Sequence, residues 1–204
     1  MKKKLQKFAL FVLALTVLSS CKKSEDDSDL IAANECKNTT LWLKNGHKLA
    51  YKDFPISLLG DSLFYEFKEE KPGIFRTLQR IDKGTTVTSL YFQPCGNIIY
   101  QSSVISMNNK YEVYRLDGNI GENWSYTQDS GAGYSVTNKT TITEKNVNLT
   151  VPAGTFKCIK LLMVTTYPTA PIGGLKTEMW FNEKYGMIKA KGYSAHYELA
   201  KANY

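Results

Sequence analysis

Any thiol chemistry of this 204-residue chain depends on four cysteines, and the first of them, Cys21, directly follows an apolar segment near the N-terminus. It ends the run Leu18-Ser19-Ser20-Cys21, which comes after an uncharged, largely apolar stretch over residues 8–18 and a positive start with Lys2, Lys3, Lys4 and Lys7. This arrangement is typical of a secretory signal. The apolar stretch is shorter than the about 20 residues that a membrane-spanning helix needs.

The small residues before Cys21 resemble the lipobox of bacterial lipoproteins. The resemblance implies that residues 1–20 are removed and that Cys21 carries diacylglycerol and palmitate; an ordinary signal peptide is the alternative. The acidic run over residues 24–29 resembles the export tag that some Gram-negative bacteria use for lipoproteins of the outer-membrane surface, and it also fits a solvated tether. We expect a tether over residues 21–35 and a protein anchored by lipid to the outer membrane, displayed at the surface or facing the periplasm.

Charge and length set broad limits on the part of the chain beyond the tether. The formal charge of +7 falls to +3 once the four lysines of residues 1–20 are removed. The remaining basic residues are scattered among acidic ones and form no stripe, which argues against a nucleic-acid partner. Residues 36–204 fit one domain, which is long enough to enclose a sizeable core.

Nearly every segment of this domain has the composition of a β-strand. The segments are rich in β-branched and aromatic residues, and Gly, Pro, Asn or Asp separate them at short intervals. We find no long stretch of helical period, and only residues 51–61 could hold a helical turn. We predict an all-β, antiparallel fold: a strongly curved sheet, an open barrel or a sandwich. The predicted strands are 63–67, 74–81, 85–92, 97–105, 110–116, 136–148, 156–164, 175–181, 187–190 and 193–199.

The three later cysteines differ in their surroundings. Cys158 lies in the apolar run Phe156-Lys157-Cys158-Ile159 and is typical of a small buried side chain. Cys36 and Cys95 lie beside polar and turn residues, and a disulfide is permitted outside the cytoplasm. If any pair bridges, we favour Cys36 with Cys95, although spacing alone does not settle connectivity.

The sequence offers no constellation for catalysis or metal binding. His47 and His196 are the only histidines, and neither accompanies a nucleophile motif. Residues 131–135 lack the G-x-S-x-G elbow, and residues 117–122 fail the spacing of a calcium loop. We therefore expect no enzyme activity, no cofactor and no metal.

Three motifs in the second half resemble the TapB-like family of secreted and lipid-anchored bacterial proteins, which are associated with secretion across the outer membrane. They are Gly121-x-x-Trp124, Val151-Pro152-Ala153-Gly154-Thr155-Phe156-x-Cys158, and Trp180 followed by Tyr185-Gly186-Met187-Ile188-Lys189, all within residues 117–191. The resemblance implies an antiparallel β fold without known enzymatic activity. It also implies a looser similarity to carriers of the LolA type, in which a curved half-barrel wraps a hydrophobic ligand. From the residues themselves, we expect the two tryptophans to fill core, Pro152 and Gly154 to shape a bulge, and Cys158 to pack.

Two non-catalytic functions are consistent with these features. The first is an interaction or scaffolding module at the outer membrane, whose tyrosine-rich strands bind an envelope protein or glycan. The alternative is a carrier of a lipid or other hydrophobic ligand, with a cavity lined by Phe64, Phe67, Phe75, Leu90, Phe92 and Leu162. An apolar cavity of about 300 Å³ or more would favour the carrier. A filled core with an exposed aromatic patch would favour the interaction module.

Overall fold

A computed structural model describes residues 36, 40–53, 62–81, 85–129, 134–169, 173–192 and 196–203. The signal segment, the acylation residue Cys21 and the tether over residues 21–35 lie outside the described residues. Within the described part of the chain, no helix is long and apolar enough to cross a membrane.

The described residues form a single antiparallel sheet of twelve strands, which confirms the predicted all-β class. The strands are β1 (Lys48–Asp53), β2 (Ser62–Lys71), β3 (Ile74–Ile81), β4 (Thr85–Cys95), β5 (Ile98–Ser102), β6 (Tyr111–Arg115), β7 (Asn123–Asp129), β8 (Ser135–Val151), β9 (Gly154–Thr166), β10 (Leu175–Asn182), β11 (Gly186–Gly192) and β12 (His196–Ala202). Residues 51–53, where a helical turn was one expectation, belong to β1 instead.

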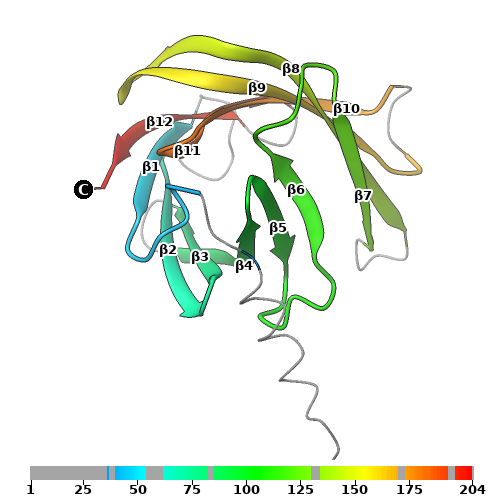
Figure 1. Cartoon of the computed structure of the whole chain (residues 1–204), viewed down its shortest axis with the longest axis horizontal. Coiled ribbons are helices and arrows are strands. Elements are labelled where there is room, and N and C mark those ends of the chain that lie inside the picture. The colour runs from blue at the N-terminus through cyan, green and yellow to red at the C-terminus, as the bar shows by residue number, and fades with distance from the viewer. Residues whose placement is uncertain are drawn as a thin grey trace, which may run out of the picture.

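The strand order divides the sheet into two meanders of equal strand number. Strands β1–β6 follow one another in space, as do β7–β12, and the ladder between β1 and β12 joins the two halves. The sheet curls until its two outer strands, β6 and β7, face each other on the far side, so that it forms a nearly closed barrel (Figure 1). Antiparallel strands can be joined by short connections, and within each meander the strands that follow one another in the sequence are therefore neighbours in the sheet.

The core lies inside this curl. The completely buried apolar side chains come from both meanders and include Ile99 of β5, Ile142 of β8, Leu161 of β9, Ile188 of β11 and Leu199 of β12. In β8 the side chains alternate between more and less exposed positions, because successive residues of a strand point to opposite faces. The alternation that suggested half-buried strands is therefore the pattern that encloses the core.

The contact between β6 and β7, which we call the seam, depends on side chains. The indole Nε1 of Trp124 in β7 donates a hydrogen bond to the carbonyl oxygen of Val113 in β6 at 3.3 Å. The rings of Tyr111 and Tyr126 stack with centroids 4.9 Å apart, and Arg115 pairs with Glu122 in the loop that leads into β7. The seam closes the curl with specific side chains in place of a backbone ladder.

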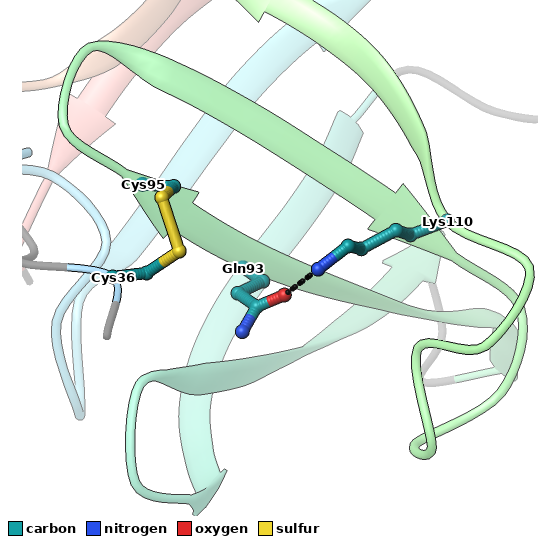
Figure 2. Close-up of a disulfide and its surroundings, with 4 residues drawn as sticks. All are labelled: Cys36, Gln93, Cys95 and Lys110. Atoms are coloured by element: carbon teal, nitrogen blue, oxygen red, sulfur yellow. Dashed lines mark hydrogen bonds between the residues drawn. A yellow bond between two sulfur atoms is a disulfide. The ribbon is translucent and has the colours of Figure 1, made fainter. Parts of the chain in front are cut away.

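A disulfide joins Cys36 to Cys95 at the end of β4, the pair that the residue environments favoured (Figure 2). Close to it, the Nζ of Lys110 donates a hydrogen bond to Oε1 of Gln93 at 2.8 Å. A bridge across a sequence separation of 59 residues restricts the unfolded chain. In the chain-entropy account such a restriction contributes about 4 kcal/mol to stability. It fastens the segment before β1 to the first meander.

Candidate ligand-binding cavity

Two adjoining cavities occupy the interior of the curled sheet. The first, the Thr77 cavity, has a volume of about 130 Å³ and is enclosed mainly by β1–β6. The second, the Met179 cavity, has a volume of about 160 Å³ and reaches the seam through Val113 and Tyr126. Four residues line both cavities, namely Gln101, Tyr114, Met187 and Tyr197. The two spaces therefore share a wall at the middle of the molecule.

Strand periodicity places the residues of the Thr77 cavity. Several neighbouring strands each contribute residues two positions apart, which point to the same face of the sheet. These pairs are Leu49 and Tyr51 in β1, Tyr65 and Phe67 in β2, Thr77 and Gln79 in β3, and Leu90 and Phe92 in β4. The cavity is thus built by a spacing that is visible in the sequence.

This spacing corrects part of the predicted lining. Phe67, Leu90 and Phe92 line the Thr77 cavity as expected, whereas Phe64, Phe75 and Leu162 line neither cavity. Phe64 is one residue away from Tyr65 and therefore points to the other face of β2. Phe75 lies on the same face of β3 as Thr77 but nearer the start of the strand, and it packs in the main core cluster beside the cavity. Both the face and the position along the strand therefore decide which aromatic ring reaches the cavity.

Buried tyrosines give the cavities their polar edge. The hydroxyl of Tyr51 donates a hydrogen bond to the backbone oxygen of Met187 at 2.7 Å, and the hydroxyl of Tyr197 donates to the Sδ of Met187 at 3.6 Å. Burial raises the pKa of Tyr65 to about 12 and raises those of Tyr51, Tyr114 and Tyr197 as well. These hydroxyls therefore stay neutral at physiological pH.

Neither cavity has a charged wall. Among the described residues that line the two spaces there is no Lys, Arg, His, Asp or Glu. An ion buried among such side chains would lose its hydration without gaining a counter-charge. The lining thus suits an uncharged, mostly apolar molecule.

Two residues that line the Thr77 cavity each have one fully buried polar atom without a hydrogen-bond partner among the described residues: the Nε1 of Trp42 and the Oγ1 of Thr77. Their residues are only 4% and 3% exposed. Buried polar atoms are nearly always paired in folded proteins, so these two atoms are exceptions to the usual pairing.

Gly186 explains how Trp42 reaches this position. The glycine has a φ of +79°, and a Cβ there would come within 2.8 Å of the Trp42 ring. The loop that carries Trp42 is also fastened to β2, because the Gly46 amide donates to the Phe67 oxygen and the Phe67 amide donates to the His47 oxygen. One residue of the family-like motif thus acts by making room for the indole.

The V-P-A-G-T-F-x-C motif forms the tip of the long β8–β9 hairpin. The amide of Ala153 donates a hydrogen bond to the oxygen of Leu199 in β12 at 3.1 Å, and the ring of Phe156 packs edge-on against Tyr185. Gly154 has a φ of +130°, the hydroxyls of Thr150 and Thr155 lie 3.0 Å apart, and Val151 is buried while Pro152 is exposed. The motif therefore folds the hairpin tip onto β12.

Cys158 and Trp180 also have packing contacts. The Cys158 thiol is buried, and burial raises its pKa to about 11. The ammonium groups of Lys160 and Lys189 lie 5.2 and 5.8 Å from the centre of the Trp180 ring. Gly121, with a φ of +90°, turns the chain before β7 and donates its amide to the oxygen of Ile142 at 2.8 Å.

The residues considered for other chemistry have separate surroundings. His47 is buried, with its ring 6.0 Å from that of Phe67, and burial together with the nearby Lys44 charge lowers its pKa. Asp117 accepts a hydrogen bond from Asn97 at 3.1 Å. No group of three or more possible metal-binding side chains occurs in the part of the chain that the structure describes.

A wide, mostly polar depression of about 730 Å³ lies on the other side of Phe181. Phe181 lines both this depression and the Thr77 cavity, and its ring lies 4.3 Å from that of Tyr114. The depression carries charges of both signs, including Asp117, Lys145 and Glu183. Phe181 thus separates an uncharged interior from a charged surface.

The large apolar side chains that are exposed on the described surface lie apart from one another in the sequence. Four large apolar or aromatic side chains are strongly exposed among the described residues, and they come from separate segments: Leu41, Val104, Ile120 and Tyr134. This distribution gives the interaction module no aromatic patch in the described part of the molecule.

Comparisons with known proteins inform on the fold alone. A candidate lipoprotein from Parabacteroides distasonis matches with a TM-score of 0.50 and 13% identity, over 81% of this chain and 100% of that chain. A candidate exported protein with a YmcC-like fold from Bacteroides fragilis matches with a TM-score of 0.49 and 12% identity, over 80% of this chain and 98% of that chain. No family model and no curated protein matches the chain. The TapB-like resemblance therefore stays a prediction from the motifs.

Proposed function

We propose that this protein is a non-catalytic lipoprotein of the cell envelope that binds a small, uncharged, mostly apolar ligand inside its curled sheet. The observation that carries the proposal is the pair of adjoining cavities with an aromatic and methionine-rich lining that holds no charge. Binding sites for small molecules are mostly apolar and hold a few polar groups that fix orientation, and this description fits the tyrosine-edged interior.

Cavity size limits the ligand. Each cavity is close to the about 150 Å³ that holds one benzene-sized molecule in a protein core. Both are smaller than the cavity of about 300 Å³ or more that is expected of a lipid carrier. We therefore favour a molecule with one or two small rings or a short alkyl chain over a whole membrane lipid.

The residues around Cys21 and the disulfide support a location in the cell envelope. The lipobox-like residues before Cys21 and the acidic tether support anchoring to the outer membrane, and a Cys36–Cys95 bridge suits an oxidising compartment. An interaction module at the same place remains a prediction, without a surface patch in its favour.

Binding can be tested with naphthalene and its charged analogue naphthoate. In the purified full-length protein, isotope-labelled methionine methyl groups report on the interior, because Met187 lines both cavities and Met163 and Met179 line the second. We expect naphthalene to shift these signals and naphthoate to bind at least about tenfold more weakly, since the lining offers no counter-charge. Equal binding of both probes, or of neither, would contradict the proposal.

A cavity-filling variant locates the binding. Ala190 is buried and lines the Met179 cavity, so Ala190→Leu should weaken naphthalene binding. Ala202→Leu adds the same atoms to a half-buried position of β12 that lines neither cavity, and it should leave binding unchanged. Melting curves of both variants show whether each one folds.

Anchoring has its own test. Cys21→Ala should abolish palmitate labelling and release the protein from the membrane fraction. A variant that is still labelled and membrane-bound would show that another residue carries the lipid.

A further inference from the structure

Gln101 brings a side-chain amide into the mostly apolar interior. It lies in β5 two residues after the completely buried Ile99, so both side chains point to the inner face of the sheet. Gln101 lines both cavities and belongs to the wall that they share. A molecule in either cavity therefore lies next to this residue.

The amide of Gln101 is open to the interior space. Its side chain has no hydrogen bond to the described residues, and the residue is only partly buried. The unpaired side-chain atoms that the described protein seals completely belong to Trp42, His47 and Thr77, and neither amide atom of Gln101 is sealed in this way. On the inner face of β5, the two cavities are the space from which a small molecule can reach the amide.

The neighbours of Gln101 leave its hydrogen bonds to such a molecule. Its direct ladder partners are Phe92 in β4 and Tyr111 in β6. The Phe92 side chain has no polar atom, and the Tyr111 ring is stacked against Tyr126 across the seam. The amide is thus flanked by aromatic rings and carries donors and an acceptor that the described protein does not use.

The chemistry of an amide selects the ligand group that fits it. The carbonyl oxygen accepts hydrogen bonds and the NH₂ group donates them, and the cavities are large enough for water to pair with both. A ligand that displaces this water without replacing its hydrogen bonds loses affinity. A hydroxyl can donate to the oxygen or accept from the nitrogen and is neutral, as a lining without charged side chains requires.

We propose that Gln101 binds the hydroxyl group of a neutral, mostly apolar alcohol or phenol at the wall between the two cavities. The inference rests on the proposed function and adds the chemical class of the ligand to it. The apolar body of the ligand lies in the Thr77 cavity against Leu90 and Phe92, or in the Met179 cavity against Met179 and Ala190.

Two probes, 2-naphthol and 2-methylnaphthalene, test the proposal, because they share one ring system and differ in a hydroxyl against a methyl group. The Met187 methyl signal of the purified full-length protein reports on binding, since Met187 lines both cavities. Gln101→Met keeps the length of the side chain and removes the amide. It should lower the preference for 2-naphthol about tenfold, the factor expected for one hydrogen bond. The different hydration of the free probes cancels when the two proteins are compared.

Gln79→Met is the matched control. Gln79 lines the Thr77 cavity and not the Met179 cavity, and it has an interaction of its own within the protein. This variant should leave the preference for 2-naphthol unchanged. Melting curves show whether each variant folds. In the unmodified protein, 2-naphthol should also shift the side-chain amide signals of Gln101 more than 2-methylnaphthalene does, which gives a measurement that depends on no variant.

The outcomes separate this inference from the proposed function. If both probes bind and Gln101→Met keeps the preference of the unmodified protein, the hydroxyl site is wrong while the apolar cavity stands. The site is equally wrong if Gln79→Met lowers the preference as much as Gln101→Met, or if both probes shift the Gln101 amide signals equally. If neither probe shifts the Met187 signal, both the cavity function and the hydroxyl site are overturned.

Discussion

The two meanders of the sheet meet at two junctions that are built in different ways. At the β1–β12 junction, a backbone ladder runs from Leu49 paired with Ala202 to Asp53 paired with Tyr197. At the seam between β6 and β7, the described contacts are between side chains or from a side chain to the backbone. A ladder uses groups that nearly every residue carries, whereas the seam needs particular side chains. The comparison indicates that the identity of residues matters most where the sheet closes.

The seam contacts nevertheless keep the register of an antiparallel pair. Tyr111 contacts Tyr126, Val113 contacts Trp124, and Arg115 contacts Glu122. Each step of two residues forward along β6 therefore matches a step of two residues backward along β7 and the loop before it. Val113 and Tyr126 also line the Met179 cavity. The seam is therefore a wall of the proposed binding space, and weakening it should expose that space.

The largest effect is expected for Trp124→Ala. Trp124 is only 8% exposed and supplies both the hydrogen bond to Val113 and apolar contact within its core cluster. Truncation of a buried tryptophan costs about 3–5 kcal/mol. Denaturant unfolding measures this loss, and amide exchange should rise locally over residues 111–115 and 123–126.

Trp180→Ala sharpens the same comparison. Trp180 is equally buried but lies in β10, which is paired by ladders on both sides. We expect a loss of stability of similar size with no local rise in exchange at the seam. If both variants raised exchange at the seam equally, the seam would be no more dependent on side-chain identity than the rest of the sheet.

The next effect concerns the ladder junction. Leu199 is 0% exposed and pairs with Tyr51 across β1 and β12. Leu199→Ala should cost about 2–5 kcal/mol through the cavity that it leaves. The backbone ladder persists, so the amides of β1 and β12 should still exchange only through global unfolding. Fast local exchange at this junction would mean that it, too, is maintained mainly by side chains.

The sequence predicted the ladder-paired parts of the molecule better than the seam or the cavity. Alternation and turn residues suffice to predict strands such as 74–81, which matches β3 closely. The cavity depends instead on which face each strand turns inward. The predicted lining included Phe64 and not Tyr65, yet the face of β2 that carries Phe67 also carries Tyr65. The pairing of Trp42 with Gly186 joins residues far apart in the chain, and no local pattern encodes it.

A smaller effect is expected where the two tyrosine rings stack. Tyr126→Leu keeps apolar bulk at the seam but removes the parallel stack with Tyr111. Stacked aromatic pairs contribute about 0.5–1.5 kcal/mol beyond the area that they bury, so we expect a loss of about 1 kcal/mol in denaturant unfolding. Tyr134→Leu is the control, because Tyr134 is exposed and its ring lies beside that of Tyr167, outside the contacts that form the seam. A change within about 0.5 kcal/mol is expected there.

The smallest effect concerns the ion pair at the end of the seam, and it depends on pH. The hydrogen bond from Arg115 holds the pKa of the Glu122 carboxyl below its usual value. Because the pKa is lower in the folded protein than in the unfolded chain, the pair stabilises the fold above the unfolded pKa, and this contribution is lost as the pH falls through the folded pKa. Glu122→Gln should therefore lower the melting temperature slightly at about pH 7 and have no effect at about pH 2, where both forms are uncharged. The difference should also shrink in about 1 M salt, since both groups are partly exposed. Arg115 keeps its bonds to Glu112 in the variant. A pH-independent difference would therefore mean that the Glu122 contact acts through packing and not through charge.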